Sequence, residues 1–578
     1  MALQALPSAA SICPPFTDHS TLLLHFLSSF SSSSSPKLLS FAAGSLLLLA
    51  LWVLVALITW THPGGPSWGK KSLLSKPTSH PPIPGPRGLP FFGSLLNFAA
   101  HNCPHRLLAS LASLHKARSL MALSLGSTRV IVSSEPSTAR EILCNSAFAE
   151  RPLTQSARQL LFGRAIGFSP RGTHWRNLRR LSASHLFCPR RIAAQENMRQ
   201  KDCALMLDAI AEKLARSSLQ EVRPYLQHAA LNSIMATVFG RQYAFSEIDA
   251  RGGEAYVVQR MVREGFELLG AFNMADHLPP AFESIDPLNI RQRCEALVPQ
   301  VFTFVQGIID EHRRCNDTSS SPSEQQQRDD RDDFVDVLLA LQREEKLSDS
   351  DMVSILWEMI FRGTDTMAIL TEWILAELVL NPNVQAKLHV EVTAMAAQRE
   401  QGELRDADIA RMPYLQAVVK EGLRIHPPGP LLSWARLAVH DTEVGGHRVP
   451  AGTTAMVNMW AITHDDRVWA EAERFKPERF VEGEGGENVD VRGSDLRLAP
   501  FGAGARVCPG KAMALATVNL WVARIVQRFH MSEHPLHRVQ LDEVLKLSCE
   551  MKIPLRACFT QGSSLSNNPP PFCALGRV

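Results

Sequence analysis

Apolar residues recur at helical spacing along most of the chain, from about residue 89 to residue 558. Two short segments, 128–132 and 454–458, instead have the β-branched and apolar content that is typical of strands. The pattern therefore predicts a mainly α fold with small β-sheets. We find no self-similar period that would indicate a solenoid.

The longest helical pattern runs from Asp351 to Leu380 and ends at an Asn-Pro pair. A glycine inside a helix costs up to about 1 kcal/mol relative to alanine, so Gly363 suggests that another group approaches the backbone closely. A kink with the Thr366 hydroxyl bonded to a carbonyl four residues earlier is the structural alternative for this polar position. One face of the predicted helix carries four residues at spacing i, i+4, i+7 and i+11: Met359, Gly363, Thr366 and Leu370.

The segment 38–60 contains 23 residues without a charge. As an α-helix it is long enough to cross the hydrocarbon core of a bilayer, which is about 30 Å thick. A cleaved signal peptide would usually have a shorter apolar region, and a plastid transit peptide would carry basic residues, which segment 1–36 lacks. We therefore expect a transmembrane anchor at 38–60, preceded by a Ser-rich segment at 1–37.

Basic residues flank this apolar segment unequally. A single lysine precedes it, and four basic residues follow it: Lys37 before, and Lys70, Lys71, Lys76 and Arg87 after. Because cytoplasmic flanks carry the excess of Lys and Arg, the C-terminal side is expected to be cytosolic.

A proline-rich stretch lies within the basic segment 61–88, at 81–88. Each proline fixes its own φ angle and restricts the residue before it, which predicts a stiff connector poor in hydrogen bonds. A ligand for a proline-recognition domain is the alternative. The position directly after the anchor favours a hinge at 61–88 that sets how the following region, 89–560, meets the bilayer. The Ser-, Asn- and Pro-rich tail at 561–578 is expected to be disordered.

Composition excludes several classes of protein. The chain has 578 residues, 45% of them hydrophobic, and a net charge of +3. This balance argues against wholesale disorder and against nucleic-acid binding, which would need an excess of clustered Lys and Arg. Eleven cysteines, an odd number with no C-x-x-C pair, fit neither a disulfide framework nor a zinc knuckle.

One cysteine, Cys508, differs from the others in its setting. Its loop, 500–510, holds three glycines and two prolines and directly precedes a predicted helix. The free N–H groups and positive dipole end of that helix favour a thiolate, which suits a soft metal. The spacing of the glycines does not fit a dinucleotide-binding fingerprint, so reducing equivalents must come from a partner protein.

At these residues the chain resembles the cytochrome P-450 family of haem-thiolate monooxygenases. The family signature Phe-x-x-Gly-x-Arg-x-Cys-x-Gly fits from Phe501 to Gly510 at every fixed position. The resemblance implies a cytochrome P-450-type fold that binds haem b. It implies that Cys508 is the axial ligand of the haem iron, that Phe501 contacts the haem, and that Arg506 pairs with a propionate.

Other motifs of that family follow in the same order. Trp175 and Arg179 match Trp-x-x-x-Arg, whose side chains reach propionates in the family, and Arg436 is placed where related enzymes often carry another propionate ligand. Taken alone, Glu421 and Arg424 at i, i+3 would be an ordinary surface ion pair. The resemblance instead implies a buried structural triad with Arg479.

The predicted long helix is similar to the oxygen-binding helix of the family. Gly363 is expected to leave room for dioxygen, and Asp365 and Thr366 to relay protons as catalytic residues. Two positions depart from the family pattern, because Arg362 replaces a small residue and Met367 replaces a hydroxyl. Arg362 could pair with a carboxylate, a propionate or a buried acid.

The resemblance implies a membrane-anchored monooxygenase that acts on an apolar small molecule with dioxygen and electrons from NADPH through an NADPH-cytochrome reductase. The residues within these motifs resemble those of a plant endoplasmic-reticulum subgroup linked to organ growth. This resemblance makes fatty acids the first candidate substrates. It also makes a growth-regulating signal a candidate product or target of the enzyme. Two rivals are a haem-thiolate isomerase or dehydratase acting on hydroperoxides, and a non-catalytic haem or ligand sensor.

Overall fold

The computed structural model describes residues 36–561 except for short gaps, at 75–79, 216, 218, 248–251, 280–281, 283–285, 287, 319–332, 343, 345–346, 400–401, 433–434, 482–485 and 487. The Ser-rich segment at 1–35 and the tail at 562–578, for which we predicted disorder, lie outside the described residues. The chain divides into two units, Met1–Thr59 and Trp60–Val578.

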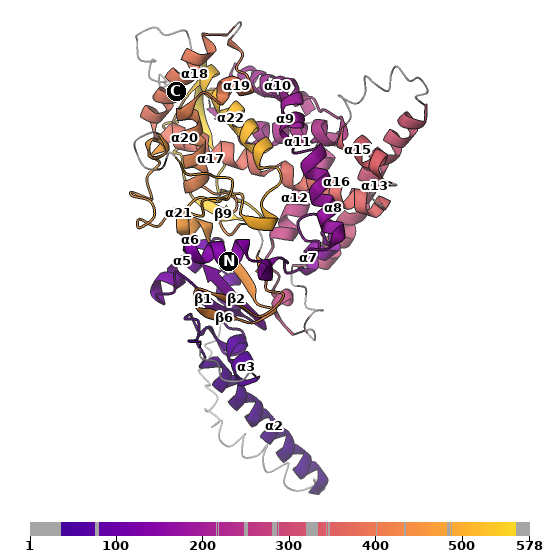
Figure 1. Ribbon diagram of the computed structural model, residues 1–578, viewed down its shortest axis with the longest axis vertical. Helices are drawn as coiled ribbons and strands as arrows, with labels where there is room; N and C mark the ends of the chain where they lie inside the picture. The colour runs from indigo at the N-terminus through magenta and orange to yellow at the C-terminus, as the bar shows by residue number, and fades with distance from the viewer. Residues whose placement is uncertain are drawn as a thin grey trace, which may run out of the picture. The chain divides into compact units, whose positions relative to one another are not determined.

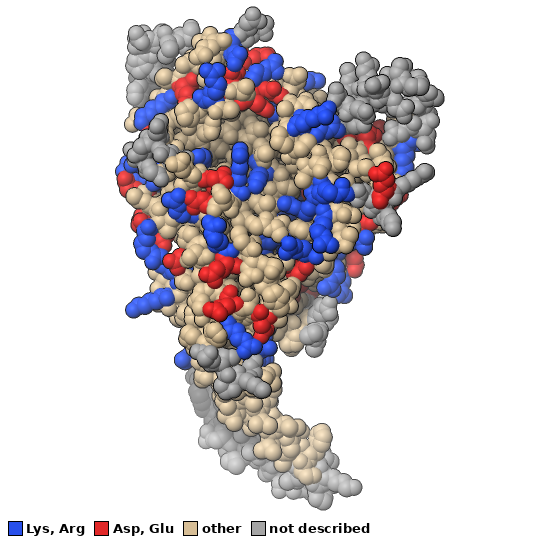
Figure 2. Space-filling view, viewed as in Figure 1, with Lys and Arg blue, Asp and Glu red and all other residues tan. Residues whose placement is uncertain are grey.

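The first unit contains helix α2 (Pro36–Trp60). Its described side chains are uncharged, as Figure 2 shows. Among the described residues it is the one helix long and apolar enough to cross a membrane, over Ala43–Trp60. This agrees with the prediction of a single membrane anchor.

The second unit is mainly helical (Figure 1). Its helices up to the middle of the chain are α3 (Pro66–Leu74), α4 (Leu95–Ala99), α5 (Pro104–Leu114), α6 (Pro136–Cys144), α7 (Gln155–Gln159), α8 (Thr173–His185), α9 (Pro189–Ala194), α10 (Glu196–Leu214), α11 (Arg223–Phe239), α12 (Glu254–Gly270) and α13 (Ile290–Thr318). The later helices are α15 (Phe334–Leu341), α16 (Asp349–Gly363), α17 (Thr366–Leu380), α18 (Pro382–Ala396), α19 (Asp406–Ile409), α20 (Pro413–Ile425), α21 (Met459–Thr463) and α22 (Lys511–Arg528).

The strands form small sheets, so the predicted fold class is confirmed. Their bounds are β1 (Met121–Leu125), β2 (Thr128–Ser133), β3 (Leu219–Glu221), β4 (Arg436–Leu437), β5 (Thr442–Val444), β6 (His447–Val449), β7 (Thr454–Val457), β8 (Phe529–Ser532), β9 (Glu543–Leu545), β10 (Cys549–Met551) and β11 (Arg556–Gln561). The largest sheet has the order β1-β2-β7-β4. Its strands β2 and β7 are the two segments predicted from sequence, and they pair with each other in parallel.

Helix α17 lies at the centre of the helical part and contacts α11, α18, α20 and α22. Its side chains from Met367 to Val379 are all buried, so this helix is covered on every face. The buried acid Glu372 is compensated, because Arg223 Nε donates to it at 2.7 Å and the Leu555 N–H at 2.9 Å. The charge of this carboxylate is therefore paired.

The prediction of a single helix from Asp351 to Leu380 is wrong in one respect, because the helix is interrupted between α16 and α17. Thr364 and Asp365 keep helical backbone angles but belong to neither helix. Gly363, Thr364 and Asp365 are all poor residues for a helix interior, and the Asp365 carboxylate accepts a hydrogen bond from Gln227 at 3.1 Å. Local sequence and a tertiary contact together explain the break.

The segment predicted as a stiff hinge contains an ordered element that the sequence did not reveal. Helix α3 packs on β1, where the Trp68 indole N–H donates to the Leu123 carbonyl at 3.1 Å. In the proline-rich stretch, the Pro84 carbonyl accepts the Ala122 N–H at 2.8 Å. Much of 61–88 is thus attached to the sheet.

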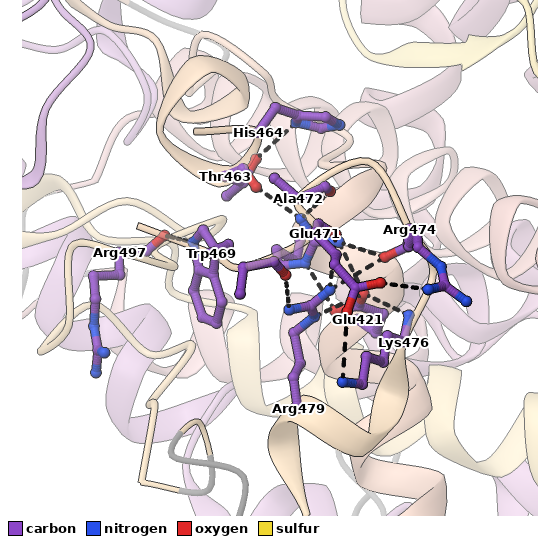
Figure 3. A network of polar contacts seen from close by, with 12 residues as sticks. Glu421, Thr463, His464, Trp469, Glu471, Ala472, Arg474, Lys476, Arg479 and Arg497 are labelled. Atoms are coloured by element: carbon purple, nitrogen blue, oxygen red, sulfur yellow. Dashed lines mark hydrogen bonds and ion pairs between the residues drawn. The ribbon is translucent and has the colours of Figure 1, made fainter. Parts of the chain in front are cut away.

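A buried polar network fixes the segment 463–480 against α20 (Figure 3). The Glu421 carboxylate has no exposed surface and accepts hydrogen bonds from Arg424 Nε at 2.8 Å and Arg479 Nε at 3.1 Å. The two guanidinium groups then donate to carbonyls of the segment, including those of Ala472 and Ala470. The structural triad implied by the family resemblance is confirmed.

We predict that Arg479→Ala lowers the free energy of unfolding by about 3–5 kcal/mol, because it removes one partner of a buried carboxylate. Arg474→Ala is the matched control: its side chain is 75% exposed and pairs only with the half-exposed Glu471, whereas its backbone carbonyl, which accepts from Arg424, is kept in the variant. The control should change stability by less than about 0.5 kcal/mol. Urea unfolding followed by tryptophan fluorescence measures both, and equal effects of the two variants would contradict a structural role for the triad.

Candidate active site

Cys508 lies at a deep cavity bounded by α8, α11, the α16–α17 break and the loop 500–510. Most of the predicted site residues line this cavity: Trp175, Arg179, Thr366, Arg436, Phe501, Arg506 and Cys508. The four residues of the predicted helix face, Met359, Gly363, Thr366 and Leu370, line it as well. The structure does not bring Asp365 into it.

The loop around Cys508 is held open by its backbone. The Cys508 N–H donates to the Phe501 carbonyl at 2.9 Å, which closes the loop. Gly502 and Gly504 have positive φ angles of 70° and 67°. A Cβ atom at Gly504 would lie 2.2 Å from the Leu143 carbonyl oxygen of α6, so only glycine lets the loop approach this helix.

Burial raises the pKa of the Cys508 thiol, while Arg362, the Gly510 N–H and Arg179 act in the opposite direction. The helix terminus invoked from the sequence is therefore outweighed by desolvation in the protein alone. A bound metal would provide the missing stabilisation, because thiolate ligation and deprotonation are coupled.

Arg506 is almost fully buried beside Cys508. Its guanidinium donates to the carbonyls of Ala149, Ile166 and Ser169 and lies 3.6 Å from the Glu150 carboxylate. Burial lowers its pKa to about 10. It also stacks over the Trp175 ring, 4.5 Å from the ring centroid.

Trp175 and Arg179 extend from α8 toward the same loop. Arg179 Nη1 donates to the Val507 carbonyl at 2.9 Å, next to Cys508. The Trp175 indole N–H donates to the Ile166 carbonyl at 3.0 Å. A propionate contact from Trp175, as the resemblance implies, would thus compete with this hydrogen bond.

Two further arginines stand at this cavity. Arg436 lies on β4 with Nη2 at 3.3 Å from the Ala503 carbonyl, and burial lowers its pKa to about 10.

Arg151 was not predicted from the sequence, because no motif surrounds it. Its buried Nε and Nη1 atoms have no hydrogen-bond partner among the described residues. Burial and the neighbouring guanidinium groups, that of Arg436 first, lower its pKa.

These residues fit a haem. A half-buried thiol at the cavity wall, converging guanidinium groups and the unpartnered Arg151 nitrogens suit one iron and two propionates. Cys508 would ligate the iron, and Arg506, Arg179, Arg436 and Arg151 would hold the propionates.

The opposite wall of the cavity is formed by the α16–α17 break. Thr366 lines it at the start of α17. A Cβ atom at Gly363 would lie 2.3 Å from Ile234 Cδ1, so this glycine admits the side chain of α11. The close approach inferred from the sequence is present. That Gly363 leaves room for dioxygen stays a prediction.

Asp365 faces a second, more polar cavity, together with Arg223, Gln227, Thr364 and Glu550. Burial raises its pKa to about 6, and Glu550 adds to the effect. The Thr364 hydroxyl is buried in the same wall and has no hydrogen-bond partner among the described residues. The adjacent residues Asp365 and Thr366 therefore open onto different cavities.

A cavity-lining thiol on a glycine loop, faced by a broken helix and surrounded by arginines, defines a haem-thiolate enzyme. The cytochrome P450 family model matches residues 83–552, and the chain belongs to this family. It is accordingly a haem-dependent monooxygenase.

Similar proteins come from plants. The chain is 53% identical over 562 residues to cytochrome P450 78A11 of Oryza sativa subsp. japonica, which covers 96% of this chain and 98% of the relative. It is 52% identical over 510 residues to cytochrome P450 78A7 of Arabidopsis thaliana, with 88% and 92% covered. It is 33% identical over 502 residues to trimethyltridecatetraene synthase of Zea mays, with 84% and 88% covered.

We predict that Cys508→Ala abolishes the red-shifted Soret band of the reduced carbonyl adduct, because that band requires a thiolate ligand. Cys144→Ala, which removes an exposed thiol next to the cavity-lining Leu143, should keep the band. Absorbance spectra of both reduced variants under carbon monoxide make the comparison. Retention of the band in Cys508→Ala would exclude Cys508 as the iron ligand.

Proposed function

We propose that this monooxygenase hydroxylates apolar small molecules, with medium- and long-chain fatty acids as the first candidates. One oxygen atom enters a C–H bond to give an alcohol, and the other leaves as water, which consumes two electrons and two protons. An NADPH-cytochrome reductase in the same membrane would supply the electrons. The observation that carries the proposal is the apolar wall of the Cys508 cavity, formed by Ile234, Val238, Met359, Met367 and Leu370.

Such a wall suits hydrocarbon chains, because burial of apolar area gives affinity without strict positional demands. One relative is named for the synthesis of trimethyltridecatetraene, a hydrocarbon. That name supports apolar ligands for this chain as a class. Membrane anchoring through α2 would favour compounds that partition into lipid.

The bound haem supplies activation of dioxygen. Cys508 would hold the iron, and the arginines around it would neutralise the propionates. Thr366 would donate a proton within the cavity, and Asp365 would renew it from the polar cavity beside Gln227. A carboxyl group with a pKa of about 6 can both take up and release protons near neutral pH, as a relay requires.

We propose the endoplasmic reticulum membrane as the location, with the catalytic unit in the cytosol. The basic residues that follow α2 support this orientation, including Lys70 and Lys71 in α3. A role in making or removing a growth-regulating signal belongs to the same proposal and rests on the subgroup resemblance.

The test uses the full-length haem protein with reductase in lipid vesicles. Fatty acids, phenylpropanoids, terpenoids and steroids are screened for a haem spectral shift, and the products are then analysed. We expect fatty acids to shift the spectrum and to be hydroxylated in proportion to NADPH consumed. Hydroxylation of only one of the other three classes of compound would exclude fatty acids as substrates. Conversion of hydroperoxides without NADPH would favour the isomerase rival, and ligand binding without turnover would favour a sensor.

We predict that Thr366→Val lowers product formation by about 10- to 100-fold, because general acid groups contribute about 10²–10⁴ to catalysis. NADPH consumption should continue, with the electrons diverted to hydrogen peroxide. Thr371→Val is the matched control, since this hydroxyl bonds to the Met367 carbonyl at 2.9 Å within α17. Product and peroxide are measured per NADPH; unchanged coupling in Thr366→Val would reduce Thr366 to a packing residue.

A further inference from the structure

Four side chains with metal-binding atoms meet where the start of α5 faces the hairpin formed by β9 and β10. Cys103 and His105 come from the α5 end, and Glu543 and Cys549 come from the hairpin. The Cys103 sulfur, a His105 nitrogen and a Glu543 carboxylate oxygen all lie within 4.8 Å of one another. Cys549 Sγ lies 3.3 Å from Glu543 Oε2. None of the four residues lines the Cys508 cavity, so this is a separate cluster.

The cluster is enclosed by the protein. His105 has no exposed surface, the Glu543 side chain is 7% exposed, and Cys549 is buried. His105 Nε2 lies 2.9 Å from Glu543 Oε1, whereas its Nδ1 has no hydrogen-bond partner among the described residues. The ring also packs edge-on against Trp460, with the centroids 5.5 Å apart. The imidazole is therefore fixed with Nε2 directed into the cluster.

The spacing of these atoms suits a tetrahedral zinc ion. Zinc binds sulfur at about 2.3 Å and nitrogen or oxygen at about 2.0–2.2 Å, so neighbouring ligand atoms of a tetrahedron lie about 3.3–3.8 Å apart. The contact of 2.9 Å between Nε2 and Oε1 and that of 3.3 Å between sulfur and Oε2 come within about 0.4 Å of this range. Small side-chain shifts would open the cluster to the ion.

The types of ligand atom select zinc among the common ions. Thiolate and imidazole groups favour zinc, whereas Mg²⁺ and Ca²⁺ take oxygen ligands. Four protein ligands leave no open position, which is typical of a structural zinc site. The ion would balance two thiolates, while the Glu543 carboxylate keeps its own cation, because Arg106 Nε donates to it. The Arg106 guanidinium is held over the Trp460 ring, 4.8 Å from the centroid.

We propose that Cys103, His105, Glu543 and Cys549 bind one structural zinc ion that fastens the hairpin to the start of α5. The two thiol protons leave to solvent when the zinc–sulfur bonds form. This inference does not depend on the proposed substrate. The spacing of the cysteines excluded only a local zinc knuckle, and it could not reveal a site whose ligands Cys103 and Glu543 lie 440 residues apart.

The hairpin also forms part of the polar cavity into which Asp365 faces. Lys546 and Ser548, at the turn of the hairpin, line that cavity. On its other side the hairpin is held by the backbone, because the Cys549 N–H donates to the Pro428 carbonyl at 2.9 Å. The zinc ion would add a second attachment and keep this wall of the polar cavity in place.

The test uses the full-length haem protein, treated with a chelator, loaded with zinc chloride and freed of excess metal. Elemental mass spectrometry should find one zinc per haem. Competition with a fluorescent chelator should give a Kd of about 10⁻⁷ M or tighter, the range of structural zinc sites. Cys103→Ser and Cys549→Ser should each weaken binding by more than about 100-fold, since losing even a supporting residue costs about 10–100-fold.

Hydrogen exchange shows whether the ion fastens the hairpin. Zinc should slow amide exchange over 543–551 in wild type and leave exchange in Cys549→Ser unchanged. Haem content and the reduced carbonyl spectrum are recorded for each variant, so that a variant that fails to fold is recognised. In that case Cys103→Ser, whose thiol is only half-buried, serves as the second variant.

Two control variants separate this cluster from other zinc binding. Cys294→Ser removes a buried thiol of α13 and should keep the zinc. His312→Gln should keep it too, although His312 belongs to the other group of described residues that could hold a metal, together with Asp333 and Asp336.

Three outcomes would overturn the inference. One is a wild-type protein that binds no zinc at a chelator-resistant site. Another is zinc that is lost from His312→Gln but retained by both cysteine variants. The third is a disulfide between Cys103 and Cys549, found by peptide mapping of the untreated protein, because oxidised sulfurs cannot ligate zinc as thiolates.

Discussion

The buried carboxylate of Glu421 is the constraint on which the organisation of the Cys508 side depends. It accepts hydrogen bonds from Arg424, Arg479 and the Lys476 N–H, and the guanidinium groups bind carbonyls from Thr463 to Arg474. An irregular segment has no ladder of its own to satisfy its carbonyls. The network therefore replaces secondary structure at 463–480, and this segment leads through 488–499 to the loop that presents Cys508. Removing one charge would leave the other charges and several carbonyls buried without partners.

One peptide then connects the two walls of the cavity. The Ile166 carbonyl accepts both the Trp175 indole and Arg506, while the N–H of the same peptide group, that of Gly167, donates to Glu358. Trp175 and Arg506, for which the family resemblance implies contacts to the haem, and Glu358 of α16 thus bond to one peptide unit. Removal of the Glu358 carboxylate would leave the Ile166 and Gly167 N–H groups without this acceptor, next to the carbonyl that Arg506 binds.

The sequence alone was sufficient to predict where a residue lies when its neighbours in the chain form a recognisable pattern with it. The Cys508 loop, the Trp175–Arg179 pair and the strands β2 and β7 each carry a local pattern, and the structure brings them to the cavity or sheet as expected. Arg151 carries no local pattern, because its role depends on guanidinium groups far away in sequence. Helix α3 was missed for the same reason, since its burial depends on β1. Hydrophobic periodicity also failed to show the break after Gly363, because it stays in phase across Thr364 and Asp365.

The break between α16 and α17 also bears on the proton relay that we propose. Asp365 and Thr366 are neighbours in the chain, yet Asp365 faces the polar cavity with Gln227 and Thr366 faces the apolar cavity with Cys508. Adjacent residues on a helix point about 100° apart, and an unbroken helix would have satisfied the backbone between them with its own hydrogen bonds. The Thr364 hydroxyl, which has no hydrogen-bond partner among the described residues, lies beside Asp365 in the wall of the polar cavity. In the proposed relay, Asp365 and Thr366 would therefore carry a proton from the polar cavity to the Cys508 cavity, whose wall includes the apolar residues Met367 and Leu370.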